Sequence, residues 1–322
     1  MGEVPVLPFI HAEQIRQALP MRRAVEAMRE AFIAFSEGRA HIPQRIQIPI
    51  PERDGITLIM PGYIPPRELG LKVVSVFPHN PERGLPAISA LVLMLDPETG
   101  APMALLDGTF LTAWRTGAAS GLATDLLARP DATSLALIGA GAQARTQLLA
   151  VCAVRPIHRI RVYSRTPERA RKWIEEMRGQ EGVPEDITLA PTPEAAVAEA
   201  DIVCTATNSS TPVFDGRSLR PGTHINAIGS FTLQMRELDE ETFRRASRVV
   251  VDSRVAALVE AGEVVWAIQQ GILQEQDLIE LGEIAAGRRP GRRSPEEITL
   301  FKSVGLAVQD LVAARWVLEA VR

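Results

Sequence analysis

Residues 134–146, SLALIGAGAQART, decide the fold of this chain. The first five form a short apolar run without the three-to-four-residue spacing of an amphipathic helix, so they predict a buried strand. The next six fit the pattern G-x-G-x-x-A and lead into a helix. In this pattern the first glycine permits a tight turn, the second lets the backbone approach a pyrophosphate, and the alanine lets helix and strand pack closely. The residues that we expect next to a dinucleotide are Gly139, Gly141, Ala142 and Gln143.

From residue 132 onwards, predicted strands and helices alternate. The predicted strands are residues 134–138, 158–163, 187–190, 201–206, 223–228 and 248–252. A glycine-rich turn can also serve packing alone, but a second strand soon after it is the context that a dinucleotide motif requires. The alternation predicts an α/β fold with the parallel, doubly wound sheet of a Rossmann domain.

The chain before residue 130 has a different pattern. A helical segment at 11–38 is followed by a succession of predicted strands at 44–50, 57–60, 70–77, 88–95 and 103–107 and by a helix at 111–127. Strands without helices between them predict a mostly antiparallel sheet. Residues 253–285 are expected to be helical, and 296–321 to form one long final helix. We therefore expect a smaller α+β substrate-binding and dimerisation domain from residues 1–130 plus 300–322, and a Rossmann domain from 131–299.

Composition excludes several classes of partner. The 322 residues include 35 basic and 39 acidic side chains, a net charge of −4, so there is no electrostatic footprint for nucleic acid or an anionic membrane. Cys152 and Cys204 are isolated and lack metal-ligand spacing, which suits small core residues in a reducing compartment. No targeting signal or long apolar run is evident. We expect a cytoplasmic protein without a metal site.

Lysine is scarce in this chain. Only Lys72, Lys172 and Lys302 occur among the 35 basic residues. Where arginine is favoured, a remaining lysine can mark a position that needs a proton-releasing group, because arginine does not lose its proton. Lys172 lies in a polar stretch typical of a solvated helix face, whereas Lys72 and Lys302 lie in apolar surroundings.

The end of the second predicted Rossmann strand bears on the choice of cofactor. An NAD-binding protein usually has an acidic residue there for the ribose. This chain has Ser164, Arg165 and Thr166, with Arg169 one turn further on. Hydroxyls and a guanidinium suit a 2′-phosphate, although an arginine at a helix start can also be merely solvated. We expect NADP(H) to be favoured, with NAD(H) possible.

Three segments each place one cation among apolar or small residues. The cations are Arg45, Lys72 and Arg115. Taken singly, such a cation can simply pack its stem on apolar surface or form an ion pair. Taken together, they can bind a carboxylate, to which arginine offers a bidentate fork. A desolvated Lys72 near two arginines should have a lowered pKa and could act as acid or base.

The same segments carry a resemblance to a known family. They are Arg45, GLKVVSVFPHN (70–80), LTAWRTGAASG (111–121), LIGAGAQA (137–144), HINAIGS (224–230) with REL after it, and FKSVGLAVQDL (301–311). This ordered set, from about residue 40 to 316, resembles the ornithine cyclodeaminase/mu-crystallin family. Its members include cyclodeaminases, ketimine reductases, amino-acid dehydrogenases and opine-type synthases. The resemblance implies a Rossmann domain beside a substrate domain that forms a homodimer through its sheet.

The resemblance also implies roles for particular residues. Arg45, Lys72 and Arg115 would bind the carboxylate of a small imino or amino acid, with Lys72 as the proton donor. Further residues would lie near the ribose and nicotinamide of the cofactor: Arg115, Thr207, Gly229, Ser230, Lys302 and Ser303.

One departure from the family pattern concerns Phe231. Cyclodeaminases carry an aspartate two residues after the glycine that is Gly229 here. Phe231 offers neither a charge nor a proton acceptor for the side-chain amine of ornithine, and its ring suits an apolar side chain or a cyclic imine. Glu237, six residues on, is expected to cap a helix start.

These observations favour one activity over two others. We expect NAD(P)H-dependent reduction of the C=N bond of a 2-imino acid or cyclic ketimine, or the reverse oxidation of an amino acid. The alternatives are an ornithine cyclodeaminase, which converts ornithine to proline and ammonia, and an NADPH-binding protein without significant turnover. The side chain of the imine depends on the shape of the pocket, which the sequence does not give.

Overall fold

The computed structural model describes residues 7–321, which divide into two compact units. The N-terminal unit contains residues up to Arg115 together with those from Leu306 on, and the Rossmann unit contains Thr116–Gly305. The first boundary therefore falls within α3 (Gly108–Leu127). The sequence placed the boundaries after residue 130 and before residue 300. They lie elsewhere because the later part of α3 bonds to the Rossmann unit, as in the Asn226 side-chain donation to Thr124 Oγ1 at 3.0 Å, and because residues 298–302 form a Rossmann strand.

The N-terminal unit is built on a six-stranded sheet. Its strands are β1 (Phe9–Ile10), β2 (Ile46–Ile50), β3 (Gly55–Ile64), β4 (Glu68–Val76), β5 (Ile88–Leu95) and β6 (Pro102–Asp107). The spatial order is β1-β6-β5-β4-β3-β2, and all neighbours are antiparallel except the pair β1 and β6. The mostly antiparallel sheet predicted from the sequence is confirmed. The apolar strand β5 lies inside this sheet and not at an edge.

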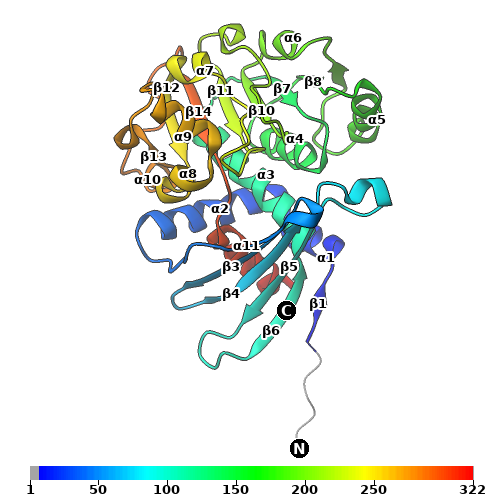
Figure 1. Ribbon diagram of the computed structural model, residues 1–322, viewed down its shortest axis with the longest axis vertical. Helices are drawn as coiled ribbons and strands as arrows, with labels where there is room; N and C mark the ends of the chain where they lie inside the picture. The colour runs from blue at the N-terminus through cyan, green and yellow to red at the C-terminus, as the bar shows by residue number, and fades with distance from the viewer. Residues whose placement is uncertain (1–6, 322) are drawn as a thin grey trace, which may run out of the picture. The chain divides into compact units, whose positions relative to one another are not determined.

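Helices cover one face of this sheet. They are α1 (Ala12–Ala18), α2 (Met21–Ser36) and α11 (Ala307–Val321), and α11 packs against β3, β4 and β5 with α2 against α11 (Figure 1). Gly62 and Gly70 are paired across β3 and β4, and a Cβ built on either would press on Leu311 of α11, at 2.9 and 3.0 Å. The two glycines therefore allow α11 to lie close to the sheet at this point.

The other face of the sheet is apolar but is not buried. Side chains alternate along a strand, so the residues between the buried positions of β4 and β5 point away from α11. They form cross-strand pairs: Leu69 with Leu95, Leu71 with Leu93, and Val73 with Leu91. Leu91 is 37% exposed and the other five are half-buried. We call these six residues the open leucine face.

The Rossmann unit is built on an eight-stranded sheet in which every recorded strand pair is parallel. Its strands are β7 (Ser134–Ile138), β8 (Arg159–Tyr163), β9 (Asp186–Leu189), β10 (Ile202–Thr205), β11 (His224–Ala227), β12 (Ala246–Val251), β13 (Ile279–Glu280) and β14 (Ile298–Lys302), in the order β13-β12-β14-β11-β10-β7-β8-β9. The helices that follow its strands are α4 (Ala142–Val154), α5 (Pro167–Met177), α6 (Pro193–Val197), α7 (Glu240–Arg245), α8 (Arg254–Glu260), α9 (Gly262–Gln269) and α10 (Leu281–Ala285). The predicted Rossmann fold is confirmed.

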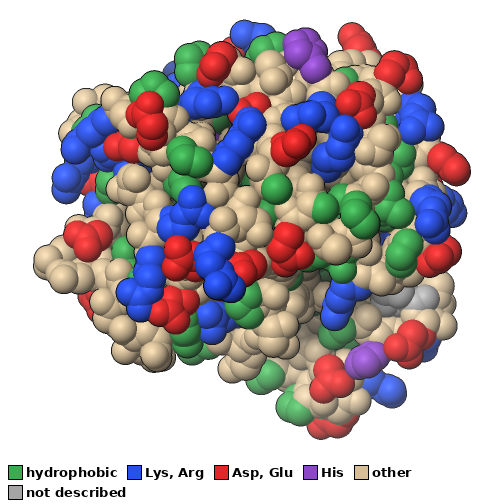
Figure 2. Space-filling view, turned by 90° about the horizontal axis from the view of Figure 1, so that it is seen from above, with side chains coloured by type: hydrophobic (Ala, Val, Ile, Leu, Met, Phe, Trp, Pro, Cys, Tyr) green, Lys and Arg blue, Asp and Glu red, His purple; other side chains and the backbone are tan. Residues whose placement is uncertain are grey.

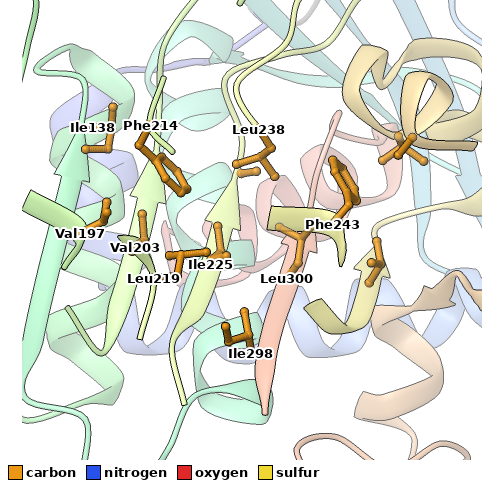
Figure 3. Close-up of a cluster of buried hydrophobic side chains, with 14 of the residues drawn as sticks. Ile138, Val197, Val203, Phe214, Leu219, Ile225, Leu238, Phe243, Ile298 and Leu300 are labelled. Atoms are coloured by element: carbon orange, nitrogen blue, oxygen red, sulfur yellow. The ribbon is translucent and has the colours of Figure 1, made fainter. Parts of the chain in front are cut away.

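Both faces of the Rossmann sheet are covered, as expected for parallel strands. Successive residues of β7 show this, because Leu135 and Leu137 belong to one buried hydrophobic cluster whereas Ala136 and Ile138 belong to another. Figure 3 shows the second cluster, in which side chains from neighbouring strands meet Phe214, Leu238 and Phe243 from the covering segments.

Of two helical predictions near the C-terminus, one was wrong and the other was right only in part. Residues 296–321 do not form one helix, since β14 enters the sheet between β11 and β12 before α11 begins at Ala307. Residues 253–285 form α8, α9 and α10 with the short strand β13 before α10. In both cases long-range strand pairing overrides an apolar pattern that also suits a helix.

The surface carries charges of both signs. On the face drawn in Figure 2, Lys and Arg side chains are interspersed with Asp and Glu. Within residues 7–321, no helix has the length and apolar character needed to cross a membrane.

Candidate active site

The glycine turn after β7 has the geometry of a phosphate-binding turn. Gly139 has a φ of +111°, and a Cβ there would lie 2.6 Å from the backbone oxygen of Ala206. Gly141 is the N-cap of α4 and places no side-chain cap on the helix. A Cβ on Gly141 would meet only the Arg169 guanidinium, at 3.8 Å. The space in front of α4 is therefore left open, and the N–H groups at the start of the helix point into this space. Because the Arg169 guanidinium also lies beside it, the turn fits the pyrophosphate of a dinucleotide.

The neighbouring predicted residues fit the same interpretation. Ala142 is exposed at the start of α4, and Ala144 is buried against the sheet. The buried Oε1 of Gln143 has no hydrogen-bond partner among residues 7–321. A buried acceptor of this kind normally has a partner, which a ligand or water can supply here.

Ser164, Arg165 and Thr166 follow β8, as predicted. The Thr166 N–H donates to Ser164 Oγ at 3.3 Å, and Thr166 is the N-cap of α5. Arg165 and Arg169 are both exposed. The end of β8 thus presents two hydroxyls and two guanidinium groups.

Glu237 holds together the ends of β10 and β11. Its fully buried carboxylate accepts from Thr207 N and Oγ1, Thr205 Oγ1 and Gly229 N, at 2.7–2.8 Å. A Cβ on Gly229 would collide with the Thr207 backbone, so only glycine permits this approach. The predicted capping role was wrong, since α7 begins at Glu240 with Asp239 as its cap. Four donors occupy the acceptor sites of Glu237, so it is poorly suited to accept a proton from a substrate.

Lys302 is held within the Rossmann unit. Its ammonium donates to Ser230 O at 2.6 Å and Ser230 Oγ at 2.7 Å, and lies 3.1 Å from Glu263 Oε1. Ser230 Oγ also bonds to Glu263, and all three side chains are fully buried. The ion pair therefore fixes the segment after β11 against α9.

Ser303 lies in a second buried network. Its hydroxyl donates to Asp252 Oδ2 at 2.8 Å, and the N–H groups of Val304 and Gly305 donate to the same oxygen at 2.8 and 2.7 Å. Asp252 follows β12 and so fixes the turn after β14. Thr207, Gly229, Ser230, Lys302 and Ser303 all lie at the carboxyl ends of parallel strands, where ligands bind in open α/β sheets.

The predicted cations Lys72 and Arg115 meet in the N-terminal unit. Alternation along β4 puts Lys72 on the face that α11 covers, between the apolar neighbours Met60 and Val92 on β3 and β5. Its Nζ lies 2.7 Å from Asp310 Oδ2, and Arg115 Nε donates to Asp310 Oδ1 at 3.0 Å. Arg115 Nη1 donates to Gln309 Oε1 at 2.7 Å. Lys72, Arg115 and Asp310 are 1%, 4% and 0% exposed.

The surroundings of Lys72 change its acidity. Burial lowers the pKa of Lys72 from the usual 10.5 to about 7, because the ammonium is desolvated. Asp310 opposes this shift in the pKa, whereas the charges of Arg115 and Arg45 add to it. Lys72 can therefore exchange a proton near neutral pH, as the sequence suggested.

The other residues predicted to bind the substrate are Arg45 and Phe231. Arg45 is half-buried just before β2, near enough for its charge to act on Lys72. Phe231 is half-buried in the Rossmann unit and packs against the hydrophobic cluster of Figure 3. Arg115 has Nε and Nη1 engaged by Asp310 and Gln309.

Several residues of these clusters were not predicted from the sequence to belong to the site. They are Gln309, Asp310, Glu263 and Asp252. Asp310 had a usable signal, because it is the one acid in the apolar stretch Gly305–Ala314. A charged residue in such a stretch is buried only when it is paired.

The fold and these clusters define a Rossmann-type protein with the glycine turn of a dinucleotide-binding site, whose N-terminal unit buries Lys72 and Arg115 around Asp310. The model of the ornithine cyclodeaminase/mu-crystallin family matches residues 8–322. The chain belongs to this family, as the sequence resemblance implied.

Individual relatives agree with this assignment. The chain is 42% identical over 312 residues to a Δ1-pyrroline-2-carboxylate reductase of Bacillus cereus, covering 96% of this chain and 95% of the relative. Its structure matches that of Thermococcus litoralis Δ1-pyrroline-2-carboxylate reductase in complex with NADH and L-proline, with a TM-score of 0.94, 41% identity and coverage of 98% and 97%. It also matches an archaeal alanine dehydrogenase dimer with bound NAD, with a TM-score of 0.89, 35% identity and coverage of 98% and 96%.

Proposed function

We propose that this protein is an NAD(P)H-dependent reductase of the C=N bond of 2-imino acids, with a cyclic imine such as Δ1-pyrroline-2-carboxylate as the substrate class. The observation that carries the proposal is the buried Lys72–Asp310–Arg115 cluster, in which a lysine with a near-neutral pKa stands beside a guanidinium. Relatives of about 40% identity that are named for this reaction support it. A protein that only binds NADPH would not need such a lysine.

The chemistry follows from the residues present. When bound, the nicotinamide supplies a hydride to the imine carbon. Arg115 and Arg45 bind and orient the substrate carboxylate. The Lys72 ammonium gives its proton to the imine nitrogen, so the C=N bond becomes a CH–NH bond. Lys72, left as a neutral amine, then takes a proton from water.

The first prediction separates this activity from its alternatives. Purified protein should oxidise NADPH when given Δ1-pyrroline-2-carboxylate. With ornithine and catalytic NAD⁺ or NADP⁺ it should release little proline or ammonia, because Phe231 and the fully engaged Glu237 provide no acceptor for the side-chain amine. Robust release of both products would favour a cyclodeaminase, and NADPH binding without oxidation across a panel of imines would favour a binding protein.

The second prediction concerns Lys72. Lys72→Ala should lower the kcat of imine reduction about 10²–10⁴-fold, because a general acid is lost, while NADPH binding measured by fluorescence is retained. Reduction needs the ammonium form, so the wild-type kcat/KM should fall as pH rises through about 7, the pKa of Lys72. A near-normal kcat in Lys72→Ala would mean that the proton comes from another group.

The preference for NADP(H) is part of the proposal. The relatives of known structure described above were solved with NADH or NAD. In this chain, Ser164, Arg165 and Thr166 follow β8, and Arg169 lies near the glycine turn. No carboxylate stands among residues 164–166 to repel a 2′-phosphate, and the two guanidinium groups can bind one.

The third prediction tests this preference. Arg165→Asp should lower the ratio of kcat/KM for NADPH to that for NADH about 10- to 100-fold, because it removes a charge-assisted hydrogen bond and adds repulsion. Lys172→Asp, further along α5, is the control for a change of surface charge and should leave the ratio unchanged. Equal or better use of NADH by the unmodified protein would contradict the preference.

A homodimer is also proposed. The open leucine face presents six large aliphatic side chains, which a second subunit would cover. The alanine dehydrogenase that the chain resembles is described as a dimer.

The fourth prediction is that light scattering gives twice the mass of one chain at micromolar concentration. Leu71→Glu, in the middle of the open leucine face, should give a monomer, because an unpaired charge is costly to bury. A wild-type monomer under the same conditions would exclude the dimer.

A further inference from the structure

Asp310 is the carboxylate that two buried cations share. Its two oxygens lie 2.7 Å from Lys72 Nζ and 3.0 Å from Arg115 Nε, and it is fully buried. It lies in the first turn of α11, which the Gly62–Gly70 pair allows close to the sheet. Lys72 comes from β4 and Arg115 from α3, so three separate segments meet at this group.

We propose that Asp310 is a positioning residue of the reaction: through its two ion pairs it keeps Lys72 in the ammonium form that can give up a proton, and it fixes Arg115 beside it. The inference rests on the proposed imine reduction, for which Lys72 is the acid. Asp310 acts through Lys72 and needs no contact with the substrate.

The charges around Lys72 make this role necessary. Arg115 from α3 and Arg45 from the segment before β2 both favour the neutral amine, and burial acts in the same direction. The partners of Lys72 on β3 and β5, Met60 and Val92, carry no charge. Asp310 is thus the group that opposes these effects on the ammonium, and removing its charge leaves them unopposed.

Asp310→Asn is a selective test, because it changes charge more than shape. The asparagine Oδ1 can still accept from Arg115 Nε, but its amide would donate towards Lys72 and so favour the neutral amine. The alkaline limb of the pH profile of kcat/KM should therefore move to lower pH by about one unit or more. At about pH 8 the variant should be roughly tenfold or more slower than wild type, and it should recover most of the wild-type rate at low pH.

Glu68→Gln is the matched control. Glu68 is a second buried carboxylate on the same face of β4, and it pairs with Arg315 of α11, which keeps partners in Glu30 and Glu319. This variant perturbs the same packing of helix on sheet without touching Lys72 or Arg115. It should lower thermal stability but leave the pH profile in place, and both variants should bind NADPH like the wild type.

A second variant tests the same role in case Asp310→Asn does not fold. Gln309 Oε1 accepts from Arg115 Nη1 and from the Leu306 N–H at 2.8 Å, and Gln309→Glu keeps both acceptors while adding a negative charge. The alkaline limb should then move to higher pH, the opposite direction.

The outcomes separate the two proposals. A wild-type protein that reduces no imine would refute the proposed function itself. Given an active wild type, a limb that stays in place in Asp310→Asn would overturn the role of Asp310. So would an Asp310→Asn protein that binds NADPH but is inactive at every pH, since lowering the pH should restore the ammonium. If Asp310→Asn does not fold, an unmoved limb in Gln309→Glu overturns the role instead.

Discussion

The N-terminal unit depends on one buried carboxylate. Without Asp310, Lys72 and Arg115 would be two like charges side by side in a desolvated place, which is unfavourable for both. The ion pairs also join α11 to β4 and α3, so the same interaction that makes the cations tolerable holds the helix on the sheet. The carboxylate of Asp310 thus both balances the charge of Lys72 and Arg115 and holds α11 on the sheet.

In the Rossmann unit, buried carboxylates likewise join separate segments at the carboxyl ends of the strands. Glu237 ties β10 to β11, Glu263 with Lys302 ties the next segment to α9, and Asp252 fixes the turn after β14. The two hydrophobic clusters stabilise the body of the sheet, but they do not determine where its loops lie. Buried carboxylates with several donors hold those loops in one geometry, as a preorganised binding site requires.

The sequence predicted what local pattern determines. Residues 134–144 were enough to place the glycine turn, because its strand, turn and helix each leave a short-range signature. The segment 298–302 was missed as a strand, because a short run with three apolar residues (Ile298, Leu300 and Phe301) just before a helix suits either structure until its partners β11 and β12 are known.

The role of Glu237 was misassigned for a similar reason. Its acidic character beside a polar turn suggested a helix cap. Its four donors instead come from Thr205, Thr207 and Gly229, which follow or end the strands β10 and β11. The apolar stretch around Asp310 indicates that it is paired, but nothing local identifies its partners, which lie 195 residues or more earlier in the chain. Carboxylates that bridge distant segments are therefore the part of a site that spacing alone does not reveal.

The order in which the chain is made follows from the position of α11. The helix belongs to the N-terminal unit, yet the ribosome makes it only after the whole Rossmann unit. Domains generally fold as units during synthesis, the earlier ones first. Here the earlier unit is completed last: until α11 is synthesised, its sheet lacks the helix that packs directly on β3, β4 and β5, and Lys72 lacks its counter-ion Asp310. A nascent chain of this protein can thus complete its Rossmann unit before the buried ion pair of Lys72 and Asp310 forms.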